Sequence, residues 1–180
     1  MKDTMKKEDI YKIIEIAFVL IVSSAMYLYG FAKYMQFDDP AEVSKRVAEM
    51  TGMELMWAFY GYSKSYTILL GMLEITGGTL LLIRKTRILG GIILTGILVN
   101  VIAQDIFYSV NEGALRAAII YQIMIFGILW INRGALIRGI SAMMLQEKEN
   151  TPPRQRKMMV IFVAVIFAIL LKFIEFRLSH

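Results

Sequence analysis

The feature of this sequence that most limits its fold is a series of five apolar stretches separated by polar connections. A helix needs about 20 mostly apolar residues to cross a hydrocarbon core about 30 Å thick. Such stretches cover about residues 13–35, 66–83, 88–110, 114–131 and 158–174. Hydrophobic residues make up 57% of the chain, above the roughly 45–50% of a soluble domain. The sequence therefore predicts an all-α membrane protein: a four-helix bundle plus a fifth transmembrane helix, in one domain over residues 1–180.

Two of these stretches allow a second interpretation. The first follows a pair of lysines, as the apolar part of a cleaved signal peptide would, but it is long and Glu15 interrupts its start. The core of the fifth stretch is short, so it could instead form a helix that lies in the membrane interface. Lys172 and Glu175 could reach the far interface from its end, which favours a true span.

The distribution of Lys and Arg predicts the orientation of the spans. Basic residues gather before the first stretch, in the 84–87 turn, and in a 133–157 linker that contains Pro152 and Pro153. Cytoplasmic loops of membrane proteins collect such residues. We therefore expect a multi-pass protein of the plasma (inner) membrane, with its amino terminus and the basic 133–157 linker in the cytoplasm. The carboxy terminus then lies outside if the fifth stretch crosses.

The acidic loop between the first two spans, residues 38–65, is expected outside. Asp38-Asp39-Pro40 is typical of a helix start, which predicts a short amphipathic helix over residues 41–50. Residues 53–62 then carry several aromatic side chains, typical of a belt at the membrane interface. A loop that folds back onto the bundle would also form a lid, for which the candidates are Glu54, Trp57 and Tyr60.

Polar side chains within the spans are the candidates for a binding site. Ionisable residues in a membrane are costly and usually face the interior of a bundle. Asn100, Gln104 and Tyr108 follow an i, i+4, i+8 spacing, so they share one helix face. The candidate ligand-binding residues, all expected in the outer half of the membrane, are Lys33, Glu74, Asn100, Gln104, Asp105 and Tyr108. These groups, and Gln122 at a similar depth, could instead hydrogen-bond one another and only fix helix packing.

Two further features concern packing. Lys33 is the cation placed to pair with Glu74 or Asp105 at this depth. Small residues let membrane helices approach closely. The second and third spans are therefore expected to pack together through Gly77, Gly78, Gly90, Gly91 and Gly96.

The residue types exclude several kinds of site. The chain has no cysteine, and its one histidine is His180. Disulfides, iron–sulfur clusters and cysteine zinc sites are excluded, and a bis-histidine haem has no ligands. We expect no metal site and no covalently bound cofactor, and no catalytic residue can be assigned. The net charge of +5 lies in short runs between apolar stretches, so the expected partner is the lipid bilayer and not nucleic acid.

Four segments within about residues 15–132 resemble the DoxX and DoxX-like membrane proteins. They read YGFAKYMQF, MELMWAFYGYS, GMLEITGGTLLLIRKTRILGGIIL and NVIAQDIFY. The most specific parts are Gly30 with Lys33, and Glu74 followed by Gly77, Gly78 and Arg84. The resemblance implies a four-helix bundle in the plasma membrane. Members are named as small subunits of a terminal quinol oxidase or of a thiosulfate:quinone oxidoreductase, and others associate with redox-defence proteins.

Three functions stay open on this basis. The first is an accessory subunit of a redox or respiratory system that binds a small lipophilic ligand, such as a quinone, in an outward-facing polar cavity. Glu74 or Asp105 could pass a proton when a quinone changes redox state. That role needs a partner membrane or redox protein. The second is an assembly factor or scaffold without ligand chemistry, and the third is a small-solute transporter, which the lack of inverted repeats disfavours. A homo-oligomer is compatible with each of them.

Overall fold

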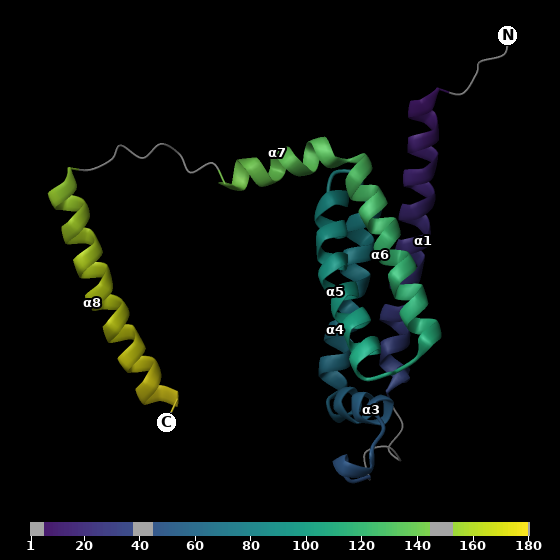
Figure 1. Ribbon diagram of the computed structural model, residues 1–180, viewed down its shortest axis with the longest axis horizontal. Helices are drawn as coiled ribbons and strands as arrows, with labels where there is room; N and C mark the ends of the chain where they lie inside the picture. Colours follow the sequence, from purple (N-terminus) through teal and green to yellow (C-terminus); the bar gives the residue numbers. More distant parts are fainter. Residues whose placement is uncertain (1–5, 38–44, 145–152, 180) are drawn as a thin grey trace. The chain divides into compact units, whose positions relative to one another are not determined.

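The computed structural model describes residues 6–37, 45–144 and 153–179. Within these ranges all regular structure is helical (Figure 1), which confirms the all-α prediction. The elements are α1 (Lys7–Gln36), η1 (Val47–Glu49), α3 (Gly52–Tyr62), α4 (Lys64–Leu82), α5 (Arg87–Phe107), α6 (Glu112–Ile131), α7 (Arg133–Met144) and α8 (Arg154–Ser179). The chain divides into two compact units, Met1–Arg138 and Gly139–His180.

The four long helices of the first unit form an antiparallel bundle. α1 packs against α4 and α6, and α5 packs against the same two helices, so the four close into a ring. Short turns join α4 to α5 and α5 to α6, which makes these neighbours antiparallel. The core consists of buried apolar side chains from all four helices: Val19, Val22, Ala25, Met26, Leu81, Leu94, Leu98, Ala118, Ile125 and Ile128. The predicted four-helix bundle is therefore confirmed.

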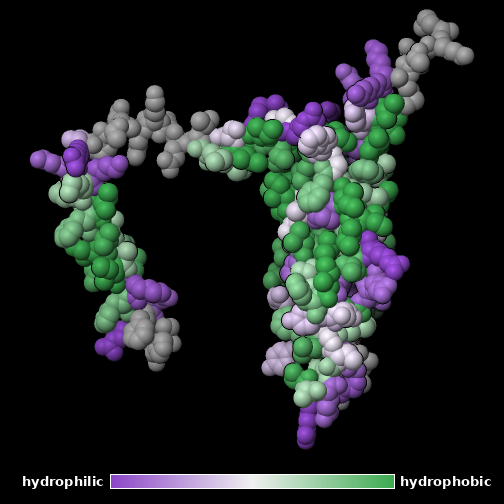
Figure 2. All heavy atoms as spheres, in the orientation of Figure 1, coloured by the Kyte–Doolittle hydropathy of each residue, from purple (hydrophilic) through white to green (hydrophobic). Residues whose placement is uncertain are grey.

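The outer surface of the bundle is apolar too. Large hydrophobic side chains such as Leu28, Phe31 and Met72 are exposed on it. Figure 2 shows hydrophobic residues over much of the middle of the bundle and hydrophilic residues gathered toward its ends. Contact with lipid tails is favourable for such an apolar surface, whereas contact with water is unfavourable.

α8 has the same character on its own. Its apolar side chains are exposed along the helix, and in Figure 2 its hydrophilic residues lie toward its two ends. Near its carboxyl end Lys172 donates to Glu175 over 2.7 Å. With α8 included, five helices within the described ranges are long and apolar enough to cross a membrane. The chain is a multi-pass membrane protein.

The short helix of the loop between α1 and α4 lies later in the sequence than expected. Of the predicted 41–50 helix, residues 45–50 are described and form only the 3-10 turn η1, while residues 38–44 lie outside the described ranges. The helix is α3, which contains the aromatic segment. The cause is a capping box: Thr51 Oγ1 accepts from the Glu54 N–H over 3.2 Å, and Glu54 Oε2 accepts from the Thr51 N–H over 2.8 Å.

The expected 133–157 linker also contains a helix. α7 covers its first half, residues 145–152 lie outside the described ranges, and α8 starts directly after Pro153. Leu136, Ile140 and Met143 recur at helical spacing in α7. Their periodicity was masked by the basic residues around them. Proline is favoured at helix starts, which fits the place where α8 begins.

A polar cluster fixes the end of the bundle at the α4–α5 turn. Arg87 Nη1 lies 2.8 Å from Glu15 Oε1, and Asn132 Nδ2 donates to the same oxygen over 2.8 Å. The Arg87 and Glu15 side chains are each 13% exposed. This cluster ties α1, α5 and the end of α6 together, and it explains why Glu15 is tolerated in an apolar stretch.

The glycines expected between α4 and α5 serve three different helix pairs. A Cβ on Gly77 would lie 2.5 Å from Leu94 Cδ2, and one on Gly90 would lie 2.5 Å from the Leu81 backbone nitrogen, so these two belong to the α4–α5 contact. Gly78 instead faces α1, and Gly91 faces α6. Gly96 has nothing within 4 Å among the described residues. The prediction was wrong for these last three because spacing along a helix does not say which neighbour each face meets.

Candidate functional site

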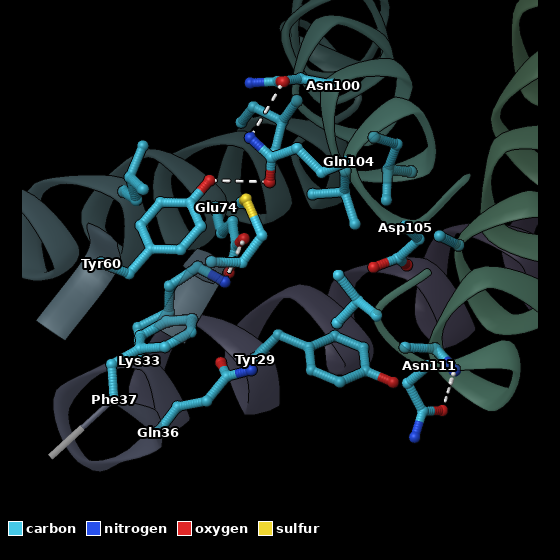
Figure 3. Close-up of a pocket in the computed structure, with 18 of the residues that line it drawn as sticks. Tyr29, Lys33, Gln36, Phe37, Tyr60, Glu74, Asn100, Gln104, Asp105 and Asn111 are labelled. Carbon is cyan, nitrogen blue, oxygen red and sulfur yellow. Dashed lines mark hydrogen bonds and ion pairs between the residues drawn. The ribbon is translucent and has the colours of Figure 1, made fainter. Parts of the chain in front are cut away.

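A cavity of about 380 Å³ lies within the bundle, and α3 forms part of its wall. α3 lies at the end of the bundle opposite the α4–α5 turn (Figure 1). The cavity walls come from all four bundle helices, from α3 and from the turn before α6. Aromatic, aliphatic and methionine side chains supply most of the wall. The polar side chains in it are Tyr121 and, labelled in Figure 3, Tyr29, Lys33, Gln36, Tyr60, Glu74, Asn100, Gln104, Asp105 and Asn111.

A buried ion pair forms the polar centre of this cavity. Lys33 Nζ in α1 lies 3.1 Å from Glu74 Oε1 in α4, and the two side chains are 14% and 6% exposed. The second carboxylate oxygen, Glu74 Oε2, is buried and has no hydrogen-bond partner among the described residues. A buried acceptor without a partner is costly, so Glu74 is suited to accept a hydrogen bond from a ligand.

The crossing of α1 and α4 brings this pair together. A Cβ on Gly30 would lie 2.8 Å from the Gly71 carbonyl oxygen, so the two backbones touch there. Lys33 and Glu74 each follow one of these glycines by three residues. Side chains tilt toward the amino terminus of their own helix. Because α1 and α4 are antiparallel, the two side chains therefore point toward each other across the crossing.

Asp105 supplies a second carboxylate. It lies on α5, is 9% exposed, and its Oδ2 atom has no hydrogen-bond partner among the described residues. Lys33 is the cation whose charge acts on both Glu74 and Asp105. In Figure 3 the Asp105 carboxylate stands apart from the Lys33–Glu74 pair, with the Tyr29 ring extending below both. The cavity thus offers two separate buried acceptor groups.

A chain of hydrogen bonds joins α3 to α5 along one wall. The Tyr60 hydroxyl donates to Gln104 Oε1 over 2.7 Å, and Gln104 Nε2 donates to Asn100 Oδ1 over 3.2 Å. Burial raises the pKa of Tyr60 above its ordinary value of 10.0, although the hydrogen bond with Gln104 opposes this effect. The hydroxyl therefore stays protonated and keeps its role as donor at neutral pH.

α3 is held closely against the end of the bundle. The Phe37 ring lies 5.0 Å from the Trp57 ring and 4.9 Å from the Tyr60 ring, centroid to centroid. A Cβ on Gly61 would lie 2.8 Å from the Phe37 carbonyl oxygen, and one on Gly52 would clash with the Tyr108 carbonyl oxygen. Glycines at both ends of α3 thus permit the approach that places Trp57 and Tyr60 in the cavity wall.

The structure brings most of the predicted binding residues together. Lys33, Glu74, Asn100, Gln104 and Asp105 all line the cavity, and of the two carboxylates expected as partners of Lys33 it is Glu74 that forms the ion pair. Tyr108 does not line it, and lies instead in a neighbouring surface groove with Asn100 and Gln104. The three residues of the i, i+4, i+8 row therefore do share a face, but that face turns toward the groove.

The proposed lid residues separate in the same way. Trp57 and Tyr60 line the cavity, whereas Glu54 does not. Glu54 instead pairs with Lys45 and caps α3. The Lys45 side chain and the Thr51 backbone N–H lower the pKa of Glu54 to about 2. Its place in the sequence beside the aromatic residues therefore reflects helix capping.

Sequence reasoning missed Tyr29, Tyr121 and Asn111 in the wall. The Tyr29 and Tyr121 rings lie 6.3 Å apart, and both residues read as ordinary span aromatics. Asn111 Oδ1 accepts from the Ala114 N–H over 3.0 Å. In the sequence Asn111 therefore has the pattern of a helix cap, which hides its place in the cavity wall.

Gln122 lies outside the cavity lining and donates to Thr95 Oγ1 over 3.2 Å, which fits the packing interpretation. Among the described residues, no three His, Asp or Glu side chains could hold a metal ion.

Comparison with known proteins places the chain in a family. No protein-family model matches it, and no solved structure matches it. It is 32% identical over 131 residues to the uncharacterized protein YwoB of Bacillus subtilis (strain 168), in a match that covers 71% of this chain and 82% of that protein. An identity of this size over most of both sequences indicates common descent. The chain belongs to the same family as the uncharacterized protein YwoB of Bacillus subtilis.

Proposed function

We propose that this protein is a DoxX-like accessory subunit of a redox or respiratory system, and that it binds a small lipophilic ligand such as a quinone in the cavity described above. The observation that carries the proposal is the buried Lys33–Glu74 pair, whose Glu74 Oε2 atom has no hydrogen-bond partner among the described residues, inside a cavity with a mostly apolar wall. The cavity volume of about 380 Å³ falls within the roughly 300–1,000 Å³ of ligand pockets.

The wall chemistry suits a ring that exists in two redox states. A quinone carries two carbonyl acceptors, and Lys33 is a donor for one of them. The reduced form carries two hydroxyl donors, for which Glu74 Oε2 and Asp105 Oδ2 are acceptors. Phe37, Trp57 and the methionines of the wall would pack against the ring. Reduction of the quinone to the form with two hydroxyls takes up two electrons and two protons. The electrons would come from a partner protein, and Glu74 or Asp105 would pass the protons to the ring oxygens.

We place the protein in the plasma membrane, and the charge distribution supports an outward-facing cavity. Lys6, Lys7, Arg84, Lys85 and Arg133 lie at the start of α1, in the α4–α5 turn and at the end of α6. In Figure 1 these three places are at the same end of the bundle, opposite α3. The positive-inside tendency puts that end in the cytoplasm. The α3 end and the cavity then face the outside.

Tryptophan fluorescence tests this proposal, because the chain has two tryptophans in different places. Trp57 lines the cavity, whereas Trp130 in α6 is 69% exposed and lies outside it. In lipid nanodiscs, a short-chain quinone should quench the Trp130→Phe variant saturably, since Trp57 is its remaining fluorophore. The Trp57→Phe variant should show only the linear quenching of a quinone dissolved in lipid. Linear quenching in both variants would refute the proposal.

A further inference from the structure

A surface groove between α3 and α5 adjoins the cavity. It has a volume of about 510 Å³. α3 contributes Leu55, Met56 and Phe59, and the α5 segment contributes Asn100, Ala103, Gln104, Phe107 and Tyr108. The Phe59 and Phe107 side chains are 58% and 83% exposed, so apolar surface borders the groove on both helices.

The groove and the cavity share part of their walls. Met56, Asn100 and Gln104 line both of them, so these side chains form the partition between the two spaces. Met56 is buried. Its side chain is unbranched and carries no N–H or O–H group. A methionine adapts its shape at low cost, so the Met56 part of this partition can open without breaking a helix.

Asn100, at the border of the cavity and the groove, is exposed. It is an exposed amide in a helix long and apolar enough to cross the membrane. A polar side chain of such a helix is costly where it contacts lipid tails. Its position at the border of the groove and the cavity is explained if a polar group of the ligand passes this point.

We propose that the ligand is a single-tailed amphiphile, with its polar ring in the cavity and its apolar tail in the groove between α3 and α5. This inference rests on the proposed function. The cavity volume lies near the lower limit of ligand pockets, so a ring fills it and a long tail must leave. The groove adjoins the cavity on the surface of the bundle, and the apolar side chains Leu55, Phe59 and Phe107 in its wall suit a hydrocarbon or isoprenoid chain.

Two quinones with the same ring test the inference, one without a tail and one with a decyl tail. The Ala103→Phe variant fills the groove. Ile92→Phe is the matched control, because Ile92 is exposed on α5 but lies outside the groove. Each quinone is compared between variants in nanodiscs of one lipid composition, so partitioning into lipid cancels.

Ala103→Phe should weaken binding of the decyl quinone by about tenfold, the effect of losing the burial of roughly two methylene groups. It should leave the affinity for the tailless quinone unchanged, and Ile92→Phe should change the affinity for neither quinone. Equal weakening of both quinones, or no effect on either, would overturn the inference while the proposed function stands. If neither quinone binds the unsubstituted protein, the proposed function itself fails. Phe107→Ala, which removes one wall of the groove, gives the same comparison if Ala103→Phe does not fold.

Discussion

Gly30 in α1 and Gly71 in α4 touch through their backbones: a Cβ on Gly30 would lie 2.8 Å from the Gly71 carbonyl oxygen. The Lys33 and Glu74 side chains converge on this crossing and form the ion pair of the cavity. The glycines therefore set the distance between the charges as well as the distance between the helices. The Gly-x-x-Lys pattern of the first span has a physical explanation in this contact.

Gly71→Ala should force α1 and α4 apart. The added methyl would meet the Gly30 backbone, and overpacking of this kind costs about 1–3 kcal/mol. Unfolding of the detergent-solubilised variant should therefore begin at a lower temperature. Gly96→Ala is the control, because nothing described lies within 4 Å of a Cβ there. It should be neutral, or stabilising by up to about 1 kcal/mol, and equal destabilisation by both changes would contradict this account of the crossing.

Glu74→Gln should reduce both stability and ligand affinity. Removing one partner of a buried ion pair costs about 3–5 kcal/mol, because the other charge is left without a partner. The double variant Lys33→Met with Glu74→Leu should recover much of that stability but should still not bind a quinone. Thermal unfolding and quinone titration, measured on the same preparations, separate the two effects.

Gln122→Leu is the control for the loss of binding. Gln122 is a buried polar residue at a similar depth that does not line the cavity. Its replacement should change quinone affinity by less than about threefold, whereas Glu74→Gln should lower it by about tenfold or more, the size of one lost charge-assisted hydrogen bond. Similar losses from both variants would mean that affinity reports bundle packing and not contact with Glu74.

The cap of α3 should weaken in acid. The folded protein holds the pKa of Glu54 at about 2, below its ordinary value of 4.5. A lowered pKa stabilises the fold fully above the unfolded value, and that stabilisation is lost as the pH falls from about 4.5 toward 2. Hydrogen-exchange protection of the α3 amides should decrease over this range. In Glu54→Gln the protection should be lower at neutral pH and should change less with acid; an identical pH profile in both proteins would contradict the capping role.

The orientation can be tested with single cysteines, because the natural chain has none. Tyr62 ends α3 and Lys85 lies in the α4–α5 turn, and both are accessible. A membrane-impermeant maleimide should label Tyr62→Cys in intact cells and Lys85→Cys only after lysis. The reverse pattern would place the cavity toward the cytoplasm.

The spans could be predicted from the sequence because their length and apolarity alone meet the needs of a bilayer. An ion pair of Lys33 could also be predicted, since a buried carboxylate needs a cation and Lys33 is the one at that depth. The sequence left its partner open between Glu74 and Asp105, and only the crossing of α1 and α4 selects Glu74. The outer loop was less accessible to prediction. Its helix start at Thr51 depends on a capping box, while Asp38-Asp39-Pro40 gives a more conspicuous signal. Tyr108 shows a different limit: its helix face was predicted correctly, but only the position of α3 determines whether that face borders the cavity or the groove.

The most direct test of the proposed function is an experimental structure of the protein in nanodiscs saturated with a decyl quinone. We expect density for the quinone ring in the cavity, with an oxygen within hydrogen-bond distance of Lys33 Nζ or Glu74 Oε2, and density for the tail between α3 and α5. A cavity that holds only water, with the quinone absent from the contacts of Lys33 and Glu74, would contradict the account.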